Sequence, residues 1–399
     1  MKSIAARMNR IKPSTTLAIT ARGKELKALG KDIVPFGAGE PDFDTPVYIK
    51  EAAKKAIDDG QTRYTAVPGT NELKDALIQK LKKENDLTYT RDEVMVTNGG
   101  KHALFQIFMA LVEAGDEVIV PAPYWVSYPD QIALFGGKPV LLETTDQTNF
   151  KITPQQLKEA ITEKTIAFII NSPSNPSGAA YHPDELQELA QICLKNNIYI
   201  ISDEIYEHII YDDFPVRSPA SLAPAFKDIT IIANGASKCF AMTGWRMGFA
   251  AGPAPLIKAM SKAQGQSTSN VCSITQAACV AAYTETTDVI SQMTIAFKER
   301  RDYIVPALNG IEGISCNTPQ GAFYVFPNIT ALLGKKTPKG LVLQSTADFC
   351  LSLLEDYHVA TVPGSAFGVE GYIRISYATG MEEIKKGIKR IETMVAELV

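Results

Sequence analysis

A lysine and an arginine eight residues apart form the segment with the clearest chemical potential. Lys238 follows a predicted strand and the turn-prone pair Asn234-Gly235, so its amine is expected at the carboxyl edge of a parallel sheet, where α/β proteins bind ligands. Apolar neighbours and the cation Arg246 are expected to lower the pKa of this amine. An uncharged amine can attack a carbonyl carbon, so Lys238 is predicted to be a nucleophile. The alternative is an exposed loop lysine without a chemical role.

Polar residues also follow two other predicted strands. Asn175 lies in a turn rich in Ser and Pro after one strand, and Asp203 and Tyr206 follow the next. Turns and helix caps use the same residue types, so each motif alone is compatible with a purely structural role. Their combined spacing with Lys238 favours one shared site.

The segments that must position these residues alternate in type between residues 93 and 253. Short β-branched runs are followed by breaks rich in Gly, Pro or Asn and then by helical segments, which predicts an α/β fold. Several runs are apolar without alternation, as is typical of strands covered on both faces, so we expect a mostly parallel, doubly wound sheet. The predicted strands are 93–97, 117–121, 139–143, 166–171, 198–202, 230–233 and 247–251.

The last third of the chain has a different pattern. A long helix is predicted near 290–308, with short strands near 323–326 and 372–377, which indicates a smaller α+β unit. The final helix carries apolar residues at alternating spacings of four and three, a stripe that needs a partner surface. These residues are Ile384, Ile388, Ile391, Val395 and Leu398.

Together these motifs resemble the class I aminotransferases, which are pyridoxal-phosphate enzymes of fold type I. The resemblance covers essentially the whole chain. Within the family, the chain is most similar to the bacterial aspartate aminotransferase branch, some of whose members also use prephenate. Besides Lys238, Arg246, Asp203 and Tyr206, the matching stretches occur in family order at 37–43, 64–69, 98–101, 123–129, 175–176 and 372–376.

The resemblance implies an α/β architecture with two domains. The large cofactor-binding domain, residues 46–290, would contain the mostly parallel sheet, and the small α+β domain would be built from both chain ends. Residues 1–45 would supply an arm and part of the small domain, and residues 291–399 the rest. The resemblance also implies a homodimer with shared active sites, in which Tyr64 reaches the cofactor phosphate of the neighbouring subunit.

The implied cofactor is pyridoxal 5′-phosphate. Lys238 would bind its aldehyde covalently and then move a proton between the substrate and the cofactor. Asp203 would pair with the ring nitrogen and keep it protonated. Tyr206 and Asn175 would hydrogen-bond the ring oxygen, and Trp125 would stack on the ring face.

The resemblance also implies a binding site for the cofactor phosphate, made by a helix N-terminus and one cation. Gly99 and Gly100 would offer backbone N–H groups, and Arg246 would add a charge-assisted contact. Many family members carry a hydroxyl residue three positions before the lysine, where this chain has Gly235. Whether Ser237 replaces that contact is left open by the sequence.

The implied substrate contacts centre on Arg374, whose guanidinium can hold an α-carboxylate through two parallel hydrogen bonds. A side-chain carboxylate would meet Lys101, helped by a segment that contains Lys12. The full set of implied substrate-binding residues is Gly39, Trp125, Asn175, Arg374, Lys101 and Lys12.

We therefore predict an aspartate aminotransferase that transfers the amino group of L-aspartate to 2-oxoglutarate in two half-reactions. The alternatives are a glutamate/aspartate-prephenate aminotransferase that forms arogenate, an aromatic aminotransferase, or a lyase or decarboxylase on the same fold. A non-enzymatic alternative, a pyridoxal-phosphate-binding regulatory domain, needs an added DNA-binding domain. It is disfavoured because the family-like segments begin near Lys12 and every catalytic position is filled.

Composition limits the remaining function classes. The chain has 399 residues, of which 45% are hydrophobic and 21% charged, as in globular proteins of more than one unit. A net charge of -4 argues against a nucleic-acid partner, and four scattered histidines argue against a metal site. Six cysteines without a CxxC pair indicate reduced, buried thiols. With no stretch long enough for a membrane span, we expect a cytoplasmic protein.

Overall fold

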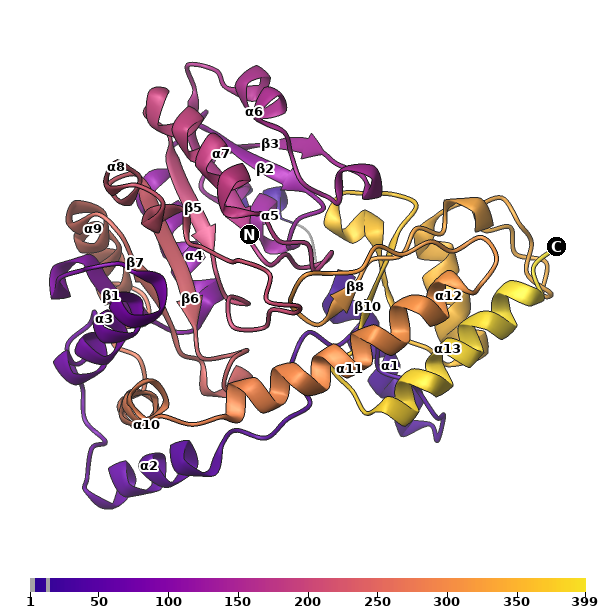
Figure 1. The fold of residues 1–399 in the computed structure, drawn as a ribbon, viewed down its shortest axis with the longest axis horizontal. Helices are drawn as coiled ribbons and strands as arrows, with labels where there is room; N and C mark the ends of the chain where they lie inside the picture. The colour runs from indigo at the N-terminus through magenta and orange to yellow at the C-terminus, as the bar shows by residue number, and fades with distance from the viewer. Residues whose placement is uncertain (1–3, 12–14) are drawn as a thin grey trace.

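A computed structural model describes residues 4–11 and 15–399, and its main element is a seven-stranded sheet (Figure 1). The strand order is β1-β7-β6-β5-β4-β2-β3. Every bound lies within two residues of its predicted position. The strands are β1 (Val94–Thr97), β2 (Glu117–Ala122), β3 (Lys138–Glu143), β4 (Thr165–Asn171), β5 (Tyr199–Asp203), β6 (Thr230–Gly235) and β7 (Gly248–Ala251).

The sheet is mostly parallel, as predicted. Strands β3, β2, β4, β5 and β6 pair in parallel, while β7 runs antiparallel to both of its neighbours, β6 and β1. Because β1 and β6 are both antiparallel to β7, they point the same way. The carboxyl ends of β1, β2, β4, β5 and β6 therefore lie at one edge of the sheet.

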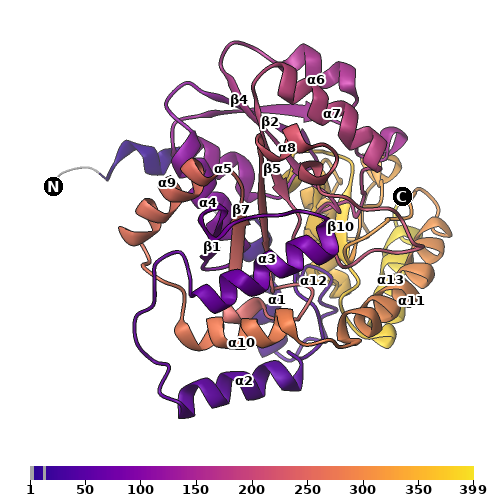
Figure 2. The ribbon, with the colours of Figure 1, turned by 60° about the vertical axis from the view of Figure 1, so that its left-hand side comes forward.

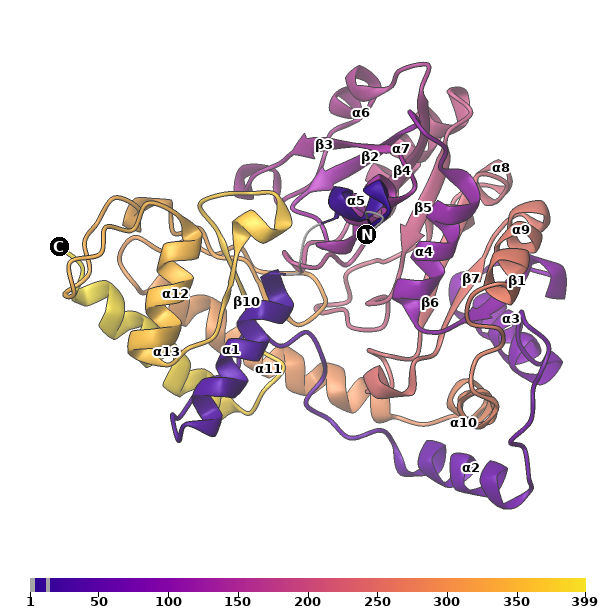
Figure 3. The same ribbon diagram turned by 180° about the vertical axis from the view of Figure 1, so that it is seen from behind.

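Apolar side chains cover both faces of the sheet, which explains the continuous apolar runs. On one face, Ile169 and Ile231 pack with residues of α4 (Gly100–Leu111) and α9 (Ala254–Gly265). On the other, Phe168 and Ile170 pack with residues of α7 (Pro183–Lys195). Figure 2 shows these helices on opposite sides of the sheet, and Figure 3 shows α4, α5 and α9 in front of it. The other helices of this part are α2 (Val47–Asp58), α3 (Asn71–Asn85), α5 (Ser127–Leu134), α6 (Pro154–Ala160), α8 (Pro224–Lys227) and α10 (Ser273–Thr284).

A smaller antiparallel sheet contains β8 (Tyr324–Val325), β10 (Ile373–Ser376) and β9 (Val362–Pro363), in that order. It is joined by α11 (Val289–Asn309), α12 (Thr346–Tyr357) and α13 (Met381–Ala396). The predicted apolar stripe of the last helix is buried in the same core as residues of α11 and α12.

The N-terminal segment belongs to this smaller unit. Val34 forms a parallel bridge with Val359, and α1 (Thr15–Ala28) contacts β9; Figure 3 shows α1 beside the small sheet. The expected small α+β unit made from both chain ends is confirmed, whereas the exact division at residues 45 and 290 stays a prediction.

The cysteines depart from expectation at one position. All six are free and five are buried, but Cys272 is exposed. It occupies the N-cap position of α10, ahead of the residues through which that helix packs. None of the helices in the described ranges is long and apolar enough to cross a membrane.

Candidate active site

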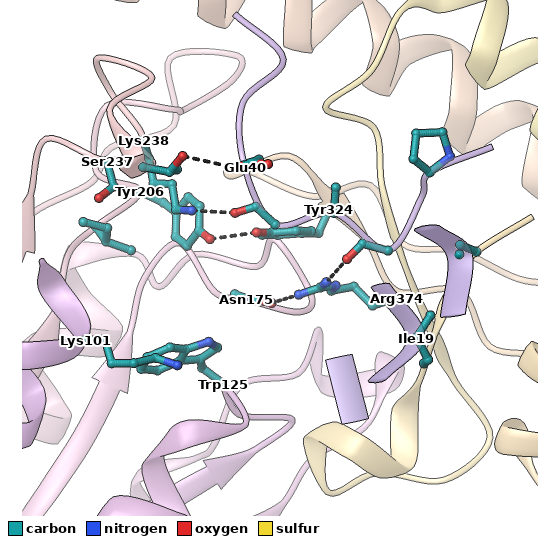
Figure 4. A pocket seen from close by; sticks show the side chains of 18 of the residues that line it. Ile19, Glu40, Lys101, Trp125, Asn175, Tyr206, Ser237, Lys238, Tyr324 and Arg374 are labelled. Carbon is teal, nitrogen blue, oxygen red and sulfur yellow. Dashed lines mark hydrogen bonds between the residues drawn. The ribbon is translucent and has the colours of Figure 1, made fainter. Parts of the chain in front are cut away.

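One large cavity opens at the carboxyl edge of the main sheet, between that sheet and the smaller one (Figure 4). Its volume of about 940 Å³ is at the upper end of the range for small-molecule sites. Most of the predicted site residues line it, although they come from separate strand ends: Gly39, Gly100, Lys101, Trp125, Asn175, Asp203, Tyr206, Ser237, Lys238, Arg246 and Arg374.

The amine of Lys238 projects into this cavity from the loop after β6. Its Nζ donates a hydrogen bond to the Gly39 carbonyl oxygen at 2.5 Å. Burial lowers the pKa of Lys238 to about 8, and the cations Arg374 and Arg246 act in the same direction, against the opposing charge of Glu40. The uncharged form, which can act as a nucleophile, is therefore more populated near neutral pH than it is for an ordinary lysine, in the direction expected from the sequence.

Asp203, the last residue of β5, supplies a buried carboxylate at the same edge. It accepts hydrogen bonds from the Tyr128 hydroxyl at 2.6 Å and from the Ile205 backbone N–H at 3.3 Å. Burial raises the pKa of Asp203 to about 6. A carboxylate removed from water in this way is stabilised by a positively charged partner, so this position favours a cationic ligand atom.

Arg374 lies on β10 and faces the cavity from the smaller sheet. Its Nη1 donates to Asn175 Oδ1 and its Nη2 to the Gly37 carbonyl oxygen, both at 2.9 Å. Its Nε is buried and has no hydrogen-bond partner in the described part of the chain, and no acidic side chain there pairs with the guanidinium. A buried, uncompensated cation with a free N–H group is suited to bind a carboxylate.

A second group of donors suited to an anion lies at the N-terminus of α4. Gly99 caps this helix with φ of 89°, and a Cβ atom at Gly99 would lie 2.3 Å from Arg246 Nη2. Only glycine allows the guanidinium to approach so closely. Arg246 is held there by bonds from Nη1 to the Thr243 carbonyl at 2.9 Å and from Nη2 to the Asn98 carbonyl at 3.3 Å. Helix N–H groups beside a fixed cation form a phosphate-type site.

Steric crowding explains why position 235 holds glycine rather than a hydroxyl residue. A Cβ there would lie 2.7 Å from the Met247 carbonyl oxygen and 2.8 Å from Gly248 Cα, so a hydroxyl residue cannot fit without a backbone shift. Gly248 is constrained in turn, because its own Cβ would lie 2.4 Å from Gly100 N. Ser237 lines the cavity, and whether it replaces the missing hydroxyl contact stays an open question.

Of the three remaining predicted residues, Lys101 lines the cavity beside Trp125, whereas Tyr64 is not among its lining residues. Lys101 Nζ lies 4.8 Å above the Trp125 ring, and burial, followed by the charge of Arg246, lowers the Lys101 pKa. Tyr64 is 92% exposed, away from the cavity of its own chain. Lys12 lies outside the described residues.

Sequence reasoning missed three residues near the reactive groups. Tyr128 donates to Asp203, Glu40 accepts from the Thr243 hydroxyl at 2.8 Å, and the Tyr324 hydroxyl lies 2.8 Å from the Tyr206 hydroxyl. Tyr128 and Glu40 belong to the motifs at 123–129 and 37–43, so motif membership could have flagged them. Tyr324 stands in a predicted strand, where a tyrosine is as readily explained by packing.

Comparison with known proteins places this geometry in a family. The family model for aminotransferase class I and II matches residues 31–391. The chain belongs to this family. This aminotransferase is 47% identical to the aspartate/prephenate aminotransferase of Cereibacter sphaeroides, with 100% of both chains covered, and 47% identical to an aspartate aminotransferase of Rhizobium meliloti, covering 97% of this chain and 95% of that one.

Solved structures agree with the sequence relatives. The crystal structure of an aspartate aminotransferase from Rhizobium meliloti superposes with a TM-score of 0.97 at 46% identity and covers 100% of both chains. An aspartate aminotransferase from Thermus thermophilus with maleate gives 0.93 at 40% identity, covering 99% of this chain and 100% of that one. The aminotransferase is thus an enzyme acting on amino and oxo acids, which confirms the predicted fold and transaminase activity.

Proposed function

We propose that this aminotransferase uses pyridoxal phosphate to transfer the amino group of L-aspartate to 2-oxoglutarate. The observation that carries the proposal is the presence, in one cavity, of a lysine amine with a lowered pKa, a buried carboxylate and an uncompensated arginine. The names of the relatives, aspartate and aspartate/prephenate aminotransferase, support the choice of substrate.

The residues present fit this cofactor at both of its ends. The N-terminus of α4 and Arg246 would bind its phosphate. The space between them is kept open by Gly99, because a side chain at this position would collide with the Arg246 guanidinium. Asp203 offers a buried carboxylate to the ring nitrogen, whose positive charge would offset the cost of burying that carboxylate. Tyr206 and Asn175 would hold the ring oxygen, and Trp125 would lie against the ring face.

When bound, pyridoxal phosphate supplies an aldehyde that takes up the amino group and a ring that withdraws electrons from the substrate α-carbon. Lys238 would hold the cofactor covalently and, once released, would take the proton from the substrate α-carbon at its Nζ. Its lowered pKa increases the share of Lys238 that carries a free lone pair, which is the form that can accept the proton. Arg374 fixes the α-carboxylate, so that the α-carbon stays within reach of Nζ.

The distal end of the substrate would meet Lys101. Its ammonium group lies over Trp125 and has no carboxylate partner in the described part of the chain, so it can pair with the side-chain carboxylate of a dicarboxylic acid. Prephenate is the second candidate acceptor, because the Cereibacter relative carries that substrate in its name. Lys12, the residue proposed to reach its second carboxylate, lies outside the described residues.

The test is a panel of half-reactions followed by absorbance. Purified enzyme loaded with pyridoxal phosphate should lose the absorbance of the bound aldehyde form on addition of aspartate or glutamate, and 2-oxoglutarate should restore it. Neutral amino acids should react more slowly by a factor of about 10² or more, since they leave the charge of Lys101 unpaired. Equal rates with acidic and neutral amino acids would rule out the dicarboxylate specificity, and no spectral change with any amino acid would rule out the proposed chemistry.

We further propose that two chains form a symmetric dimer with shared sites. Tyr64 is 92% exposed in the single chain and so does not pack within its own subunit. An exposed tyrosine between a helix and the turn at 67–69 is available to reach the phosphate site of a second copy. Each site would then need residues from both chains.

Mixed dimers test this arrangement. A Tyr64→Phe subunit should bind the cofactor about tenfold or more weakly, because a hydrogen bond to a charged phosphate is lost, and a Lys238→Ala subunit should be inactive. Dimers that combine the two should have one site with both defects and one intact site, so activity at limiting cofactor should exceed that of both parents. No recovery in the mixture would show that Tyr64 does not act across the interface.

A further inference from the structure

A buried tyrosine connects two of the residues to which the proposed function gives separate tasks. Tyr324 lies on β8 with no exposed surface, and its hydroxyl is 2.8 Å from the Tyr206 hydroxyl. Its ring also lies beneath Arg374, whose guanidinium carbon is 4.7 Å from the ring centroid. Figure 4 shows Tyr324 between these two side chains, beside the cavity.

The Tyr206 and Tyr324 hydroxyls carry one hydrogen each, so each can donate only one hydrogen bond. Burial raises the pKa of both Tyr206 and Tyr324, so each hydroxyl keeps its hydrogen at neutral pH. If Tyr206 donates to Tyr324, it has no hydrogen left for a ligand in the cavity. If Tyr324 donates to Tyr206, the Tyr206 hydrogen is free to point into the cavity, and its donor strength increases through hydrogen-bond cooperativity.

The surroundings of Tyr324 favour the second arrangement once a ligand oxygen is bound. In the described part of the chain the Tyr324 hydroxyl makes no hydrogen bond other than that with Tyr206. A negatively charged ring oxygen in the cavity attracts the Tyr206 hydrogen, and the Tyr324 hydroxyl then has one acceptor within reach, the oxygen of Tyr206. Both phenols are satisfied only in that order.

We propose that Tyr324 is a positioning residue that donates its hydroxyl hydrogen to Tyr206 and thereby keeps the Tyr206 hydroxyl directed at the ring oxygen of the cofactor. The inference rests on the proposed function, because it takes Tyr206 as the donor to that oxygen. It adds a residue whose hydroxyl acts through Tyr206.

The measurable consequence is the acidity of the imine that Lys238 forms with the cofactor aldehyde on release of water. The ring oxygen is most negative when the imine nitrogen is unprotonated, so a strong donor at that oxygen lowers the imine pKa. Tyr206→Phe should raise this pKa by about 1 to 2 units. Tyr324→Phe, which retains the ring under Arg374, should raise it by about 0.3 to 0.6 unit. A spectral pH titration of the loaded enzyme measures both values.

The double variant separates action through Tyr206 from a general effect. In the Tyr206→Phe background, Tyr324→Phe should add no further shift, since its acceptor is gone. A matched control is Tyr377→Phe, which removes the bond that Tyr377 donates to the Tyr211 hydroxyl at 3.1 Å in the same core. This control should leave the imine pKa unchanged.

The possible results distinguish a failure of the inference from a failure of the proposed function. An unchanged imine pKa in Tyr324→Phe, an equal shift in Tyr377→Phe, or a Tyr324 shift that persists without the Tyr206 hydroxyl would each overturn the inference while the proposed function stands. A wild-type enzyme that forms no imine with pyridoxal phosphate would overturn the proposed function itself, and the inference with it.

Discussion

Replacement of Lys238 with alanine is expected to reduce amino-group transfer by about 10⁴-fold, since one side chain supplies both the attachment point for the cofactor and the base for the α-carbon proton. The amine lies in the cavity with its pKa lowered to about 8 and one hydrogen bond to the Gly39 carbonyl. Turnover assays with aspartate and 2-oxoglutarate measure the loss.

The variant should remain folded and bind the cofactor without a covalent bond. The Lys238 charge is one of those that stabilise the Asp203 carboxylate, but in the loaded variant the ring nitrogen would pair with that carboxylate, so the thermal unfolding midpoint of the cofactor-bound variant should change little. Borohydride treatment of the loaded wild type, followed by peptide mass spectrometry, should place the cofactor at Lys238 alone. The Lys101→Ala enzyme is the matched control, because it lacks another lysine of the same cavity and should still be labelled at Lys238. A label on a different lysine would refute the assignment.

The sheet could be read from the sequence because its strands are apolar on both faces. Residues such as Phe168 and Ile169 point to opposite sides, yet both are buried by helices, which produces a continuous apolar run of strand length. The direction of β7 could not be read in this way. Its residues are all buried, like those of β6 in the parallel part of the sheet, and the direction of a strand depends on the path of the preceding loop, which the apolar pattern does not encode.

In the site, too, the residues set by the local sequence were predictable, whereas those set by contacts across the fold were not. Asp203 and Lys238 were predictable because each stands near the end of its own strand, and the carboxyl ends of parallel strands meet at one edge. The partners Tyr128 and Tyr324 were missed because each reaches its target across the fold: Tyr128 is 75 residues from Asp203, and Tyr324 is 118 residues from Tyr206. The need for glycine at position 235 also depends on a long-range contact. A side chain there would collide with the backbone at the start of β7, which is not adjacent to Gly235 in the sequence.

Arg374→Ala is expected to depress activity toward all amino acids alike, by about 2 to 5 kcal/mol in transition-state stabilisation, because the α-carboxylate loses its buried partner. The guanidinium also supports Asn175 and the Gly37 carbonyl, so the thermal unfolding midpoint must be measured beside kcat/KM. Arg374→Lys is the control for charge. It keeps the cation but cannot form two parallel hydrogen bonds to a carboxylate, so it should recover only part of the activity.

Lys101→Ala should produce a different pattern, because only substrates with a second carboxylate pair with that ammonium group. Activity toward aspartate and glutamate should fall, whereas activity toward neutral amino acids should be retained, since removal of an unpaired cation costs these substrates nothing. Its position over Trp125, on the side of the cavity across from Lys238 (Figure 4), allows it to act on the distal end of the substrate without disturbing the reacting atoms. The ratio of kcat/KM for aspartate to that for alanine is therefore the decisive quantity: it should fall in Lys101→Ala and stay constant in Arg374→Ala. A constant ratio in both variants would remove Lys101 from substrate recognition and leave the dicarboxylate preference without a structural basis.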